Sequence, residues 1–155
     1  MNYQLRGLEP AQFEKYFDLD DATLAARDMR RMRVNAPVGF PCRISLEDAP
    51  VGEDVLLLPF VHQDGRSPYR ASGPIFVRRG RAQAARIVNE LPSYLTLRPL
   101  SVRAYDAADE MVEAEIVDGR EAEPLIRRYL ARADVSYLHA HFARRGCFAC
   151  RIDRA

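Results

Sequence analysis

Short apolar segments of strand length, separated by polar turns, are the feature that most constrains how this chain folds. Residues 111–117 alternate between apolar and acidic side chains, as in a half-exposed antiparallel strand. Residues 55–61 are apolar on both faces, which is typical of a covered central strand, although Pro59 requires a bulge or an edge there. Since strands outnumber helices, we predict an α+β fold with a mainly antiparallel sheet and helices packed on one face.

Helices are expected at only a few places. Pro10 suits the first position of a helix, and Asp20 or Asp21 can cap a second helix that ends at Ala26. Residues 82–88 predict a third helix, and Pro124 opens a fourth. The other expected strands cover residues 3–8, 29–34, 43–46, 74–78, 95–97, 102–105, 135–142 and 147–153.

Size, charge and cysteine content narrow the class of protein. A chain of 155 residues predicts a single domain, residues 1–155, and its longest apolar run is far too short to cross a bilayer. No secretory signal begins the chain, and three cysteines is an odd number, so we expect a cytoplasmic protein without a disulfide framework. The net charge of +1 argues against a nucleic-acid partner, and we expect no membrane partner.

The last two strands form a hairpin that carries most of the reactive side chains. Of two registers, we predict the one that sets His141 opposite Cys147 and His139 opposite Ala149, with a glycine of positive φ at Gly146. This register gives an apolar face that includes Cys150 and Phe148, and a second face rich in functional groups. Cys150 is then a core residue and Cys147 is not.

Three interpretations of that second face remain open. His139, His141 and Cys147 have the nitrogen and sulfur donors of a metal site, with zinc or iron as the candidate cofactor. Alternatively, a His141 imidazolium favours the thiolate of Cys147, giving a catalytic pair. The plainer interpretation is that all three are ordinary, partly buried polar residues of a sheet.

A long loop between two apolar strands is a candidate site for a small anionic ligand. Arg70 offers a bidentate guanidinium, and Tyr69 offers a stacking surface. Ser67, Ser72 and, from an earlier segment, Arg43 complete the predicted ligand-binding set. The competing interpretation is that the prolines and glycines of the loop only set turns, and that Arg70 pairs with a carboxylate.

Several of these segments together resemble a bacterial family catalogued as domain of unknown function 1203. The motifs are Pro41-Cys42-Arg43-Ile44-Ser45-Leu46, Asp48-Ala49, Gly52-Glu53, residues 67–78, Arg103-Ala104-Tyr105-Asp106, His139-Ala140-His141 and Gly146-Cys147. The resemblance spans nearly the whole chain and implies a small, stand-alone bacterial protein. It implies no activity, cofactor or catalytic residue.

Two functions fit these observations best, and whether the chain is an enzyme stays open. The first is binding or conversion of a small anionic molecule by the arginine-containing loop and the His/Cys strand face. The alternative is a non-catalytic protein–protein interaction module that uses the same surfaces. Oligomeric state, substrate and reaction class lie beyond the sequence.

Overall fold

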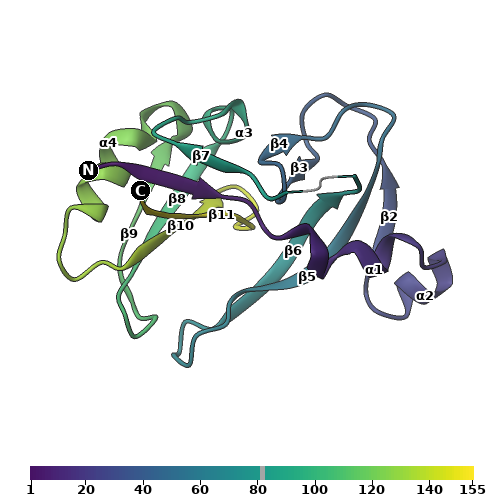
Figure 1. The fold of residues 1–155 in the computed structure, drawn as a ribbon, viewed down its shortest axis with the longest axis horizontal. Helices are drawn as coiled ribbons and strands as arrows, with labels where there is room; N and C mark the ends of the chain where they lie inside the picture. Colours follow the sequence, from purple (N-terminus) through teal and green to yellow (C-terminus); the bar gives the residue numbers. More distant parts are fainter. Residues whose placement is uncertain (81–82) are drawn as a thin grey trace.

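A computed structural model describes residues 1–80 and 83–155 of the protein, and Figure 1 shows the arrangement of its two sheets. The six-stranded sheet has the strand order β7-β1-β11-β10-β8-β9, and the five-stranded sheet has the order β2-β5-β6-β3-β4. Pairing is antiparallel throughout the described strands except between β3 and β6. The α+β class and the mainly antiparallel pairing are thus confirmed, with two sheets in place of the one expected.

The elements are as follows. In the six-stranded sheet the strands are β1 (Tyr3–Arg6), β7 (Arg86–Val88), β8 (Pro99–Tyr105), β9 (Met111–Asp118), β10 (Tyr137–Phe142) and β11 (Phe148–Arg154). In the other sheet they are β2 (Arg30–Arg33), β3 (Pro41–Cys42), β4 (Glu47–Asp48), β5 (Asp54–Gln63) and β6 (Ala71–Arg78). The helices are η1 (Pro10–Gln12), α1 (Glu14–Phe17), α2 (Asp21–Ala25), α3 (Ser93–Thr96), η2 (Gly119–Glu121) and α4 (Ala122–Leu130). Among the described residues, no helix combines the length and apolar character needed to span a bilayer.

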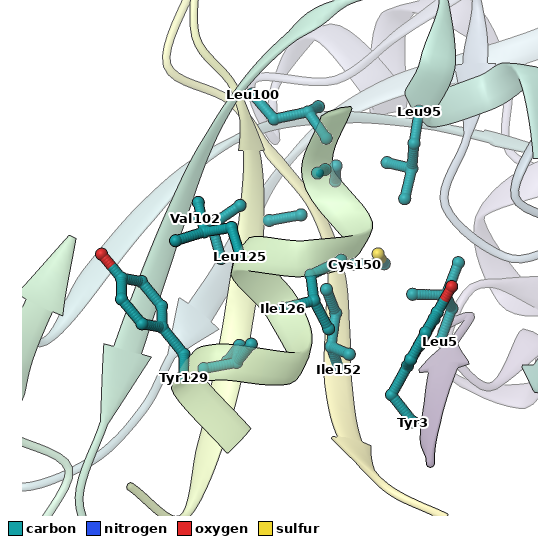
Figure 2. Packing of buried hydrophobic residues seen from close by; sticks show 14 of the residues in the cluster. Tyr3, Leu5, Leu95, Leu100, Val102, Leu125, Ile126, Tyr129, Cys150 and Ile152 are labelled. Carbon is teal, nitrogen blue, oxygen red and sulfur yellow. The ribbon is translucent and has the colours of Figure 1, made fainter. Parts of the chain in front are cut away.

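The larger core lies between α4 and one face of the six-stranded sheet (Figure 2). Leu125 and Ile126 on α4 pack against the strands beneath, where Cys150 and Ile152 of β11 are fully buried. The spacing of the apolar residues on α4 gives it one apolar stripe, and burying that stripe stabilises the helix. Cys150 is therefore a core residue, as predicted, whereas Cys147 is only partly buried.

A second core lies beneath α1 and α2, on the five-stranded sheet. Phe13, Phe17 and Leu24 pack there against residues of β5 and β6. The side chain of Asp20 accepts a hydrogen bond from the backbone N–H of Thr23, so the expected N-cap of α2 is confirmed. Pro59 lies beyond the last β5 residue that pairs with β2, so its missing N–H costs no ladder hydrogen bond there.

Three predicted elements are wrong. The strand expected over residues 43–46 is instead the turn that joins β3 to β4. The helix expected over residues 82–88 gives way to strand β7, which pairs with β1 and sets Ile87 beside Leu5 (residue 82 lies outside the described part). The strand expected over residues 95–97 belongs instead to α3, which begins after Pro92 and buries Tyr94 and Leu95. All three segments are too short for local propensity to decide, and tertiary packing selects their conformation.

The predicted register of the C-terminal hairpin is also wrong. Ala140 pairs with Cys150 and His139 with Arg151, two residues further along β11 than expected, and a bulge follows that pairs His141 with Phe148. The shift arises because Phe142 and Cys147 close the turn by a backbone hydrogen bond, with Gly146 at φ 79° as predicted. The bulge moves Phe148 from the apolar face to the histidine face.

Candidate metal centre

Strand β10 is buried on both of its faces, because α4 covers one face and the β5–β6 hairpin lies against the other. Side chains alternate along a strand, so Leu138 and Ala140 enter the α4 core while His139 and His141 point the opposite way. There they meet His62, near the end of β5. The two sheets thus bring together all three histidines of the chain.

The three imidazole rings are close enough to share one ion. The ring centroid of His62 lies 4.9 Å from that of His141 and 6.2 Å from that of His139. One ring nitrogen from each histidine lies within 4.8 Å of those of the other two. Nitrogens bound to one tetrahedral zinc ion lie about 3.3 Å apart, so small side-chain rotations would bring these three to ligating distance.

Phe148 shields the cluster. Its ring is stacked on that of His62, with centroids 5.5 Å apart and planes 3° from parallel. Its ring also contacts the rings of His139 and His141 edge to face. His139 and His141 are almost completely buried, at 3% and 0% exposure, while His62 keeps partial access to solvent. The bulge that places Phe148 on this face therefore puts an apolar ring in contact with all three imidazoles.

The hydrogen bonds of the cluster leave nitrogens without partners. Nδ1 of His141 lies 2.8 Å from the carbonyl oxygen of Gly146, so Nδ1 carries the proton and Nε2 presents a lone pair. That Nε2, together with Nδ1 of His62 and Nδ1 of His139, is buried without a hydrogen-bond partner within the described residues. Buried polar atoms are rarely left unpaired, and a metal-binding histidine commonly donates its other N–H to a carbonyl.

Burial also keeps the three imidazoles neutral. Desolvation lowers the pKa of His62 to about 4, of His139 to about 2 and of His141 to about 3. The charge of Arg103 contributes to each of these shifts, and for His139 the neighbouring His141 and His62 contribute more than Arg151 or Arg103. At neutral pH each ring is therefore in the unprotonated form that binds metals.

Polar groups continue the histidine face toward the hairpin tip. Tyr137 donates a hydrogen bond to Oδ1 of Asp109 at 2.6 Å and accepts one from Nε2 of Gln63 at 2.8 Å. Arg151 lies over the ring of Tyr137, with Cζ 3.9 Å from the ring centroid, and its Nε donates to Asp153. The hydrogen bond between Gln63 and Tyr137 ties the end of β5 to the six-stranded sheet beside the cluster.

Cys147 does not belong to the metal-binding group that the structure brings together. His141 faces Phe148 rather than Cys147 across the strands, so the predicted pairing of thiol and imidazole as cross-strand neighbours is wrong. Within the described residues, only His62, His139 and His141 form a group of metal-binding side chains. The predicted pair His139 and His141 is thus joined by His62.

The predicted anion-binding residues are spread over two places. Arg43 is buried, and its guanidinium donates to the carbonyl oxygens of Phe148 at 2.8 Å and Pro41 at 2.7 Å. Arg70 is exposed and donates to the carbonyl oxygen of Asp64 within its own loop. Ser67 donates to the carbonyl oxygen of Asp109, while Tyr69 and Ser72 are exposed. Arg43 is therefore a buried donor to backbone carbonyl oxygens, whereas Tyr69, Arg70 and Ser72 of the loop are exposed.

Sequence reasoning missed His62 as a partner of His139 and His141. It stands at the end of an apolar strand, and nothing local shows which sheet that strand end contacts. One signal was present: the chain has only three histidines, and each occupies a predicted strand or its end.

Comparison with known proteins identifies the family. No curated protein and no solved structure matches the chain. A family model described as "Protein of unknown function (DUF1203)" matches residues 39–154, which include all three histidines and the strands that carry them. The chain therefore belongs to the DUF1203 family, as its motifs had indicated.

Proposed function

We propose that the protein binds a divalent transition-metal ion, zinc in the first place, through His62, His139 and His141. The observation that carries the proposal is the convergence of three neutral imidazoles, two of them buried, each with a buried ring nitrogen that has no hydrogen-bond partner within the described residues. An ion there would satisfy atoms that otherwise lack any partner, which is a strong driving force in an apolar environment.

The donor set favours zinc over iron. Three nitrogen ligands suit tetrahedral zinc with a fourth position for water or another small ligand. Non-haem iron sites commonly add a carboxylate, and the group found among the described residues contains none. Such a centre would supply a Lewis acid and an activated water molecule, and His141 would be oriented by its bond to Gly146.

The test is metal content per chain in protein made without a histidine tag and purified without chelators. The wild type should carry close to one equivalent of zinc after loading and desalting. His62→Ala should lose most of it, because two imidazoles rarely retain zinc against dialysis.

Cys147→Ala is the matched control. It removes the other candidate ligand from the same face, and its zinc content should equal that of the wild type. Zinc retained by His62→Ala and lost by Cys147→Ala would overturn the assignment in favour of a His139, His141 and Cys147 site.

A further inference from the structure

Arg103 lies next to the histidine cluster, and no acidic partner for it is found among the described residues. It lies on β8 directly opposite His139, and Arg151 of β11 lies opposite His139 on the other side. Cross-strand neighbours project to the same face, so both arginines flank the cluster. Their environments differ, since Arg151 is paired with Asp153.

The guanidinium of Arg103 has more N–H donors than its contacts within the described residues use. Its Nε donates to Oγ of Ser101 at 3.2 Å, and the guanidinium also forms a hydrogen bond with the hydroxyl of Tyr105. No carboxylate in residues 1–80 or 83–155 forms an ion pair with it. Its positive charge lowers the pKa of all three histidines, as expected for a cation that strand pairing places on the same face of the sheet as His139. Asp109, the acid that borders this face, is occupied by the hydroxyl of Tyr137.

A metal ion at the cluster would leave this region with excess positive charge. The three imidazoles are neutral and contribute none of the negative charge that zinc sites often take from cysteine or carboxylate ligands. The ion and Arg103 would then lie near each other in a partly buried place, and the carboxylate of Asp109 at its border would offset only part of their charge. Such an arrangement is costly unless an anion binds between them.

From this juxtaposition we infer that the fourth position of the metal takes a small oxyanion, a carboxylate or a phosphate, whose other oxygen is held by Arg103. The inference rests on the proposed function. Guanidinium matches the spacing of oxygens in both groups, and an oxygen ligand suits zinc. The anion enters from the solvent-facing side of the cluster, where Arg103, Ser101 and His62 are each partly exposed.

Cobalt makes the inference testable, because Co²⁺ binds in place of zinc and its visible absorption reports a change of ligand. Untagged protein loaded with one equivalent of Co²⁺ would be titrated separately with acetate and with inorganic phosphate. We expect at least one to shift the spectrum saturably. A response to acetate alone identifies a carboxylate ligand, and a response to phosphate alone identifies a phosphate ligand.

Arg103→Met should bind cobalt with unchanged stoichiometry and bind the anion at least tenfold more weakly, with Arg103→Lys in between. Arg33→Met, which removes an exposed arginine of β2 that is paired with Asp54 of β5, should behave as the wild type. A chain that binds no cobalt refutes the metal centre and this inference with it. Bound cobalt whose spectrum neither anion changes, or an affinity unaltered in Arg103→Met, refutes this inference alone.

Discussion

Acid should unfold the metal-free protein through its buried histidines. In the unfolded chain a histidine titrates near its ordinary pKa of 6.5, whereas burial holds the pKa of His139 at about 2 and of His141 at about 3. The unfolded state therefore takes up protons first as the pH falls. Stability contributed by these groups is complete above about pH 6.5 and declines below it, down to the folded-state values.

The size of this loss of stability follows from the same pKa values. Between about pH 7 and about pH 5.5, each of these two histidines costs about 1.3 kcal/mol of unfolding free energy, giving about 2.5 kcal/mol together. The pKa of His62, about 4, also lies below this range, so His62 adds a further loss of up to about 1.3 kcal/mol. Typical domains have about 5–15 kcal/mol in total, so the loss is a substantial part of the stability.

Urea denaturation with a chelator present, repeated at both pH values, measures this loss. His139→Phe keeps a ring of similar size and removes one titrating group, so its loss should be smaller than that of the wild type by about 1.3 kcal/mol. Equal stability of the wild type at both pH values, or the same loss in His139→Phe, would refute the account of buried neutral imidazoles.

Three further predictions concern stability and metal binding. Zinc at about one hundred times its dissociation constant should stabilise the wild type by about 2.7 kcal/mol. For a chain of this size, that raises Tm by about 5–11 °C in differential scanning calorimetry. His62→Ala should show no such rise. Arg43→Met should cost about 2–4 kcal/mol in urea denaturation, since it leaves the buried carbonyl oxygens of Phe148 and Pro41 without a charged donor, and an unchanged midpoint would contradict this. Gly119→Ala should reduce Tm strongly, because a Cβ there would lie 2.1 Å from the carbonyl oxygen of Leu95, and an unaltered Tm would show that the contact relaxes.

Periodicity predicted the elements whose pattern is long and regular. The alternation of residues 111–117 gave β9, and the apolar stripe after Pro124 gave α4. Segments of three or four residues, such as β7 and α3, were assigned wrongly because their conformation depends on which neighbour they pack against.

The sequence predicted only two of the three histidines of the candidate site. His139 and His141 form a local pattern on one strand, so their shared face followed from alternation. His62 joins them only because the end of β5 packs against β10 of the other sheet, and that contact depends on tertiary packing. The bulge that moves Phe148 onto this face depends on how the turn closes, and alternation alone assigned Phe148 to the wrong side.

The most direct test of the account is the X-ray absorption spectrum of the zinc-loaded, untagged protein at the zinc edge. Three imidazole ligands predict nitrogen and oxygen scatterers at about 2.0–2.1 Å, with the outer-shell pattern of histidine rings. A sulfur scatterer at about 2.3 Å would show that Cys147 or another thiol binds the ion, and would contradict the site formed by His62, His139 and His141.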